Sequence, residues 1–74
     1  AAKVAEGRLP DYWRMVVGDH IADMTTEFRL ERHVLHVRVS SSVVRQELFF
    51  RRDELMMRLN EMAGVRLIGA VIIR

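Results

Sequence analysis

The chain has 74 residues, of which 50% are hydrophobic, with no cysteine and a formal net charge of +2. This length predicts one domain near the lower limit for a self-sufficient core, and the lack of cysteine excludes disulfides and thiolate zinc sites. The longest apolar run, residues 67–73, is too short to span a membrane, and the N-terminus lacks the apolar stretch of a signal peptide. We therefore expect a cytoplasmic protein that does not enter a membrane.

Charge is distributed unevenly along the sequence. Residues 1–37 carry five Lys/Arg and six Asp/Glu, whereas residues 38–74 carry seven arginines and four acidic residues. Arginine pairs with phosphate through two parallel hydrogen bonds and stacks on bases. The basic C-terminal half is therefore compatible with nucleic-acid binding, but does not require it.

The N-terminal part predicts a flexible segment at 1–8, followed by a single domain over 9–74 that opens with a helix. Pro10 suits a first helical position, and Asp11 suits the positive end of the helix dipole. Gly18 lies off the apolar stripe, which predicts a close backbone approach inside the helix. The stripe itself has helical spacing and consists of Trp13, Val16, Val17, His20, Ile21 and Met24. Trp13 is interpreted as a core anchor rather than a platform for stacking bases.

Two strands are predicted next. Phe28 and Leu30 alternate with charged residues, and residues 35–39 repeat an apolar side chain at every second position. The link between them, 31–34, is tight but lacks the Asn-Gly or Asp-Gly typical of a two-residue hairpin, so its turn type stays open.

Three serines at 40–42 separate the second strand from a long amphipathic helix. A serine hydroxyl accepts a hydrogen bond from a free amide in the first helical turn, so a helix start is expected there. Gly64 is expected to end this helix in the left-handed conformation. The predicted buried stripe is Val44, Leu48, Leu55, Leu59 and Met62, flanked by Met56 and Ala63.

A third strand is predicted over 65–73, where both faces are apolar. Such a strand is usually central in its sheet or paired with another chain. The resulting order is α-β-β-α-β, with helices packed on one face of a small three-stranded sheet, which is an α+β fold.

No pattern of catalytic residues is present in the sequence. The serines lack the glycine-flanked turn of a nucleophile, and Asp53 and Glu54 are adjacent, so they diverge on a helix. His33 and His36 are three apart on an extended chain and point to opposite faces, so they cannot share a metal. We expect no enzymatic activity, no catalytic residue, no cofactor and no metal.

The outer face of the long helix carries the candidate binding residues. Phe50 and Met57 are seven residues apart and lie opposite the buried stripe. This indicates a partner or dimer contact, or else a second hydrophobic layer of the same domain or scattered surface hydrophobic residues. The candidate phosphate-binding residues are Arg38, Arg45, Arg51, Arg52 and Arg58. Their spacing alone favours an ordinary solvated face, with surface ion pairs to Glu47, Asp53 and Glu54, over a phosphate-binding role.

Three blocks of sequence carry a family resemblance. They are Trp13-x-x-Val16-Val17-Gly18-x-x-Ile21-Ala22-x-x-Thr25, then Leu35-x-Val37-x-Val39-Ser40-Ser41-Ser42-Val43-Val44-Arg45-x-Glu47-Leu48, then Leu59-Asn60-Glu61 with Gly64 and a final Ile72-Ile73-Arg74. In this order and spacing the chain, from Leu9 to Arg74, resembles the DciA-related family of small bacterial proteins.

The resemblance implies a fold similar to K-homology (KH) domains and a role in DNA replication. Members of this family bind the bacterial replicative helicase, assist its loading and bind DNA, without a known catalytic site. This chain departs from the family at Arg32-His33, where relatives place Asn-Gly or a similar turn, so a longer or tilted hairpin is expected. It also lacks the G-x-x-G loop with which KH domains clamp a nucleic-acid backbone.

Two functions are therefore carried forward. The first is a non-enzymatic adaptor of the DciA type that binds DNA weakly and in a salt-dependent way through its arginines, and that binds the replicative helicase. The second is an interaction module that pairs with itself or another chain through Phe50 and Met57, or through the edge of the sheet, and does not bind DNA.

Overall fold

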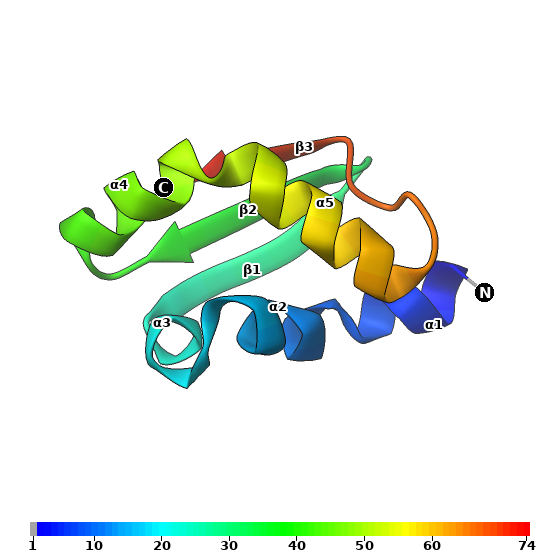
Figure 1. Ribbon diagram of the computed structural model, residues 1–74, viewed down its shortest axis with the longest axis horizontal. Coiled ribbons are helices and arrows are strands. Elements are labelled where there is room, and N and C mark those ends of the chain that lie inside the picture. The colour runs from blue at the N-terminus through cyan, green and yellow to red at the C-terminus, as the bar shows by residue number, and fades with distance from the viewer. Residues whose placement is uncertain (1) are drawn as a thin grey trace.

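The computed structural model describes residues 2–74 as helices on one face of a three-stranded sheet, confirming the predicted α+β fold (Figure 1). Strand order is β1-β2-β3, with β1 and β2 antiparallel and β2 and β3 parallel. The elements are α1 (Ala2–Gly7), α2 (Leu9–Val17), α3 (Asp19–Asp23), β1 (Thr25–Glu31), β2 (Val34–Val39), α4 (Ser42–Phe50), α5 (Arg52–Ala63) and β3 (Ala70–Ile73). Helix α1 lies within the segment expected to be flexible, and Ala5 on it is buried.

The first predicted helix is divided in two at Gly18. Its φ of 90° and ψ of 163° lie outside helical geometry and in a region that only glycine adopts readily. A Cβ built there meets nothing within 4 Å, so the predicted close backbone approach is wrong and the positive φ is the reason for glycine. Across the break, the Arg14 guanidinium contacts Asp19 at 3.1 Å and Asp23 at 3.0 Å. The break also removes His20 from the buried face, and His20 is exposed.

The link between β1 and β2 is a two-residue turn. Arg32 and His33 have φ of 51° and 66°, and Glu31 pairs with Val34 on either side of them. Positive φ at both central positions defines a type I′ turn, so the expected longer or tilted hairpin is wrong. The loop before β3 holds His33 in place: its carbonyl accepts from the Gly69 amide at 2.8 Å, and its Nδ1 donates to the Leu67 carbonyl at 2.9 Å.

The long helix is also divided, at Arg51, whose φ of −103° and ψ of 12° interrupt it between α4 and α5. Ser41 is the N-cap of α4, and its hydroxyl accepts from the Val44 amide at 3.3 Å. Gly64 ends α5 with a φ of 72°, as predicted. Met62, predicted to be buried, is 36% exposed because it lies at the end of the divided helix.

The third strand is shorter than predicted and lies at the edge of the sheet. Only Ala70–Ile73 are extended, and they pair with β2 alone within the described chain, so the predicted bounds of 65–73 and the central position are wrong. The alternative, pairing with another chain, stays a prediction. Leu67 and Ile68 are apolar because the loop carries them under α5 into the core, where they are 6% and 0% exposed.

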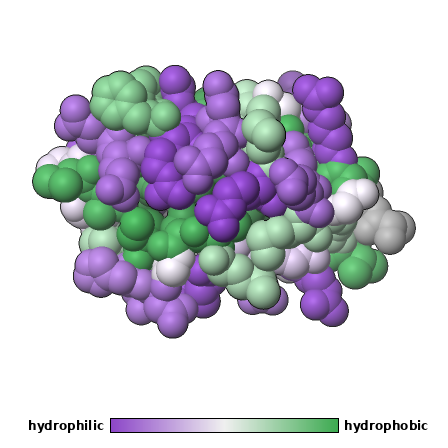
Figure 2. All heavy atoms as spheres, in the orientation of Figure 1, coloured by the Kyte–Doolittle hydropathy of each residue, from purple (hydrophilic) through white to green (hydrophobic). Residues whose placement is uncertain are grey.

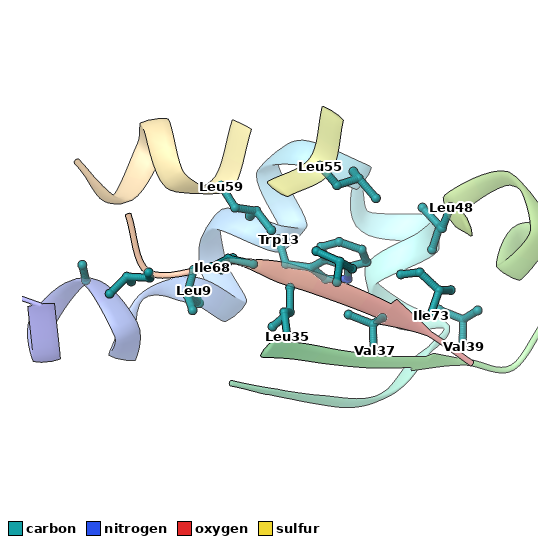
Figure 3. Close-up of a cluster of buried hydrophobic side chains, with 13 residues drawn as sticks. Leu9, Trp13, Leu35, Val37, Val39, Leu48, Leu55, Leu59, Ile68 and Ile73 are labelled. Carbon is teal, nitrogen blue, oxygen red and sulfur yellow. The ribbon is translucent and has the colours of Figure 1, made fainter. Parts of the chain in front are cut away.

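The core lies between the helices and the inner face of the sheet (Figure 3). Trp13 is 3% exposed, its indole Nε1 donates to Thr25 Oγ1 at 2.9 Å, and its ring lies 5.5 Å from that of Phe28. The prediction of a core anchor is therefore confirmed. The side chains labelled around it are Leu9, Leu35, Val37, Val39, Leu48, Leu55, Leu59, Ile68 and Ile73.

Candidate nucleic-acid and partner interface

The five predicted phosphate-binding arginines fall into three different environments. Arg51 and Arg58 share one carboxylate, that of Glu54, at 3.0 Å and 3.7 Å. The hydrogen bond from Arg51 is the main cause that lowers the pKa of Glu54, and Glu54 in turn raises the pKa of Arg51. These two arginines are therefore engaged in an ion-pair network at the joint between α4 and α5, where their charge is partly neutralised.

Arg45 and Arg52 are placed differently. Neither guanidinium forms an ion pair with a carboxylate in the described part of the chain. The Arg52 guanidinium lies 3.8 Å from the centroid of the Phe49 ring, and its Nε donates to the Phe49 carbonyl at 2.9 Å. Such stacking fixes the direction of a guanidinium while leaving its charge available.

Phe50 completes this group on the surface of α4. It is 76% exposed, and its ring packs edge to face on Phe49 at 5.7 Å between centroids. The two rings line a shallow hollow of about 490 Å³ together with Ser42, Arg45, Gln46 and Ile73, which we call the α4 hollow. Phe49 was not among the predicted residues, because in a continuous helix it lies away from the outer stripe.

Met57, predicted to form one surface with Phe50, is 59% exposed but lines another hollow. That hollow has a volume of about 510 Å³ and is formed by the second half of α5 and the loop after it, with Met56, Asn60, Glu61, Gly64, Val65 and Arg66. The break at Arg51 thus separates the two residues into different surfaces.

Arg38 lies on the face of the sheet that carries no helices. It contacts Glu27 at 3.6 Å, but Glu27 is closer to Arg29, at 3.1 Å, and Arg29 is the main cause that lowers the Glu27 pKa. The parallel register places Arg74 beside Arg38, since the Arg74 amide donates to Val37 and its carbonyl accepts from Val39. Arg74 was missed because no local pattern shows which strand lies next to the C-terminal residues.

Hydrophobic side chains gather around α4. Figure 2 shows them among the hydrophilic side chains over α4, and as a band crossing the middle of this face between α4–α5 and α2–α3. Val43, Phe49 and Phe50 of α4 are 77%, 42% and 76% exposed. The basic group of Arg45 and Arg52 therefore lies within an apolar surface.

The described residues, 2–74, contain no group of three or more His, Cys, Asp or Glu that could hold a metal ion. Within the same range, no helix is long and apolar enough to cross a membrane.

The fold and this surface define a small α+β domain, KH-like in its element order, with arginines and aromatic rings around a helix joint. The chain belongs to the family described as "Dna[CI] antecedent, DciA", whose model matches residues 1–73. It is 36% identical over 64 residues to the "UPF0232 protein in recF-gyrB intergenic region" of Mycolicibacterium smegmatis, and equally to a UPF0232 protein of M. smegmatis strain ATCC 700084 / mc(2)155. In both cases 86% of this chain is covered, but it spans only 33% of the relative.

Proposed function

We propose that this domain is a non-enzymatic adaptor in DNA replication, which binds DNA through arginines around α4 and binds the replicative helicase. The observation that carries the DNA part is the pair Arg45 and Arg52, which have no carboxylate partner in residues 2–74 and lie beside two exposed phenylalanine rings. Arginines without partners bind phosphate without first breaking an ion pair. Membership of the DciA family supports the replication role.

The surroundings of the five predicted arginines indicate how much each of them contributes to DNA binding. Arg45 and Arg52 are expected to contribute most. Arg38 and Arg58 are expected next, because their pairs with Glu27 and Glu54 are long, at 3.6 Å and 3.7 Å. Arg51 is expected to contribute least, since it is bound to Glu54 at 3.0 Å. Contacts of this kind hold phosphates and read little base sequence.

Fluorescence anisotropy with labelled single- and double-stranded DNA across a salt series tests the DNA part. Binding is expected to weaken as salt rises, and Arg45→Gln and Arg52→Gln are each expected to reduce the slope of log K against log salt by about 1. Arg51→Gln is the control, because the Arg51 guanidinium is bound to Glu54 at 3.0 Å, and it is expected to leave the slope nearly unchanged. A lack of binding even at low salt would overturn the DNA part.

A pull-down with the replicative helicase of the source organism tests the helicase part directly. Capture by the wild type is expected, and failure to capture would contradict it. Because the chain spans a third of its mycobacterial relatives, the same pull-down with a longer version of the protein shows whether this domain is sufficient.

A second candidate function is an interaction module that forms a homodimer and does not bind DNA. The exposure of Phe50 and Met57, 76% and 59%, favours it. Light scattering measures the oligomeric state of the wild type, Phe50→Asp and Met57→Asp, and shows which of the two hollows forms the contact. A dimer that only Phe50→Asp dissociates would support α4, whereas monomers throughout would exclude self-association.

A further inference from the structure

The free edge of β3 presents unpaired backbone groups. Both the amide and the carbonyl of Arg74 bond to β2, at 2.8 Å and 2.9 Å. Because successive residues of a strand point their backbone groups in opposite directions, the N–H and C=O of Val71 and Ile73 face away from β2. No further strand pairs with this edge in residues 2–74, and Figure 1 shows β3 at the border of the sheet.

The opposite edge of the sheet, β1, is protected against pairing. Its register is shifted between Thr25 and Glu27, and the strand carries the charged residues Glu27, Arg29 and Glu31. Bulges, charges and very short edge strands are devices by which natural proteins limit strand addition. The strand β3, Ala70-Val71-Ile72-Ile73, is short, but it carries neither a bulge nor a charge. The two edges therefore differ, and β3 is better suited than β1 to accept another strand.

The α4 hollow lies beside this edge. Ile73 lines it together with Ser42, Arg45, Gln46, Phe49 and Phe50 of α4. In a strand added next to β3, every second side chain would point toward the helices and enter the hollow, against Ile73 and the phenylalanine rings. Apolar side chains at alternate positions of the added strand would therefore fit the hollow.

The charged residues around the hollow indicate which kind of strand would bind next to β3. Arg45 lies on the rim of the hollow and Arg74 directly follows β3, neither has an ion pair in residues 2–74, and the hollow is lined by no carboxylate. Residues 70–74 contain no acidic residue, so a second copy pairing through its own β3 would add another Arg74 and no carboxylate from that strand. In a strand added next to β3, the side chains that do not enter the hollow point to the helix-free face, so carboxylates at these positions would lie near the Arg74 guanidinium.

We propose that the β3 edge and the α4 hollow form a docking site for an extended acidic segment of a partner protein. The segment adds to the sheet as a fourth strand, with apolar side chains in the hollow and acidic side chains on the helix-free face, toward Arg74. Main-chain hydrogen bonds supply the affinity in this mode of recognition, and the alternating side chains supply the specificity.

A short synthetic peptide of alternating glutamate and valine, capped at both ends, is the probe. NMR and amide exchange on the 74-residue chain are expected to show slower exchange at Val71 and Ile73, whose amides face outward, with little change at Ile72 and Arg74, which are already bonded to β2. The same peptide with lysine for glutamate, or with a central proline, is expected not to bind.

Arg74 lies on the helix-free face, is exposed, and offers a graded pair of variants outside the core. Arg74→Gln is expected to weaken binding of the glutamate peptide by about two- to fivefold, and Arg74→Glu to weaken it further. Equal binding of the lysine peptide, perturbation centred on β1, or no binding would overturn the proposal. Protection of Val71 and Ile73 that grows with protein concentration alone would assign the edge to a second copy instead.

This inference does not depend on DNA binding, and its failure is distinguishable from that of the proposed function. Arg45 belongs to both surfaces, so the tests use different residues: the amides of Val71 and Ile73 for the peptide, and Arg52 for DNA. Loss of peptide binding with an intact salt-dependent DNA affinity would overturn the docking site alone.

Discussion

The side chain of Asn60 forms two hydrogen bonds with the backbone of Ile68. Its Nδ2 donates to the Ile68 carbonyl at 2.9 Å, and its Oδ1 accepts from the Ile68 amide at 2.9 Å and from the Leu67 amide at 3.1 Å. Ile68 is 0% exposed, so water cannot replace these partners. Through this one side chain, α5 fixes the loop that leads into β3.

Asn60→Ala is expected to destabilise the domain by about 2–4 kcal/mol, because two amides and one carbonyl of the loop lose their partner. Urea unfolding measures this loss. Glu61→Ala, at the exposed neighbouring position, is the control and is expected to stay within about 0.5 kcal/mol of the wild type. A similar effect of both alanine variants would contradict the role of Asn60.

Gly18→Ala is expected to destabilise the domain by about 1–3 kcal/mol, since φ of 90° with ψ of 163° is a conformation that alanine strongly disfavours. Gly7 is the matched control: it lies in α1, and a Cβ there also meets nothing within 4 Å, but its φ is not positive. Gly7→Ala is expected to be neutral or to stabilise by up to about 1 kcal/mol. Thermal unfolding of the two variants distinguishes backbone strain from steric contact, because both sites have space for a methyl group.

Periodicity predicted the parts of the fold in which one face of an element is buried. Leu48, Leu55 and Leu59 are each 0% exposed, and Trp13 is in the core, because apolar spacing reports burial directly. The two helix breaks were missed for another reason. They lie at Gly18 and Arg51, and in both places the apolar stripe continues across the break, so the spacing carries no signal of it.

The position of β3 could not be predicted from its composition. Residues 67–73 form one apolar run, but Leu67 and Ile68 are buried in the loop under α5, whereas Ala70–Ile73 form an edge strand. Which strand neighbours β3 is a long-range property, and Arg38 and Arg74 become neighbours only through that parallel register. Which of the predicted arginines form ion pairs depends on which of them reach Glu54. The sequence contains several acidic residues at suitable spacing, so it does not show which pairs form.

Arg32→Asn is expected to stabilise the hairpin by about 0.5–1 kcal/mol, because asparagine tolerates the positive φ of a type I′ turn better than arginine does. Arg32 is exposed, so the substitution removes no core contact. Arg32→Val is the opposing variant: a β-branched residue at a φ of 51° is expected to destabilise by more than about 1 kcal/mol. Melting temperatures that move in the same direction for both variants would contradict a type I′ turn.

The ion pairs of Glu54 at the joint between α4 and α5 are expected to depend on pH. The pKa of Glu54 is lowered first by the hydrogen bond from Arg51 and less by Arg58. A carboxylate whose pKa is lower in the folded than in the unfolded state stabilises the fold above its unfolded pKa, and this contribution is lost as pH falls through the folded pKa. An NMR titration of the Glu54 side chain is therefore expected to show a midpoint below the ordinary value for glutamate. Arg51→Gln is expected to raise that midpoint more than Arg58→Gln does, and the reverse order would contradict the assignment of Arg51 as the principal partner.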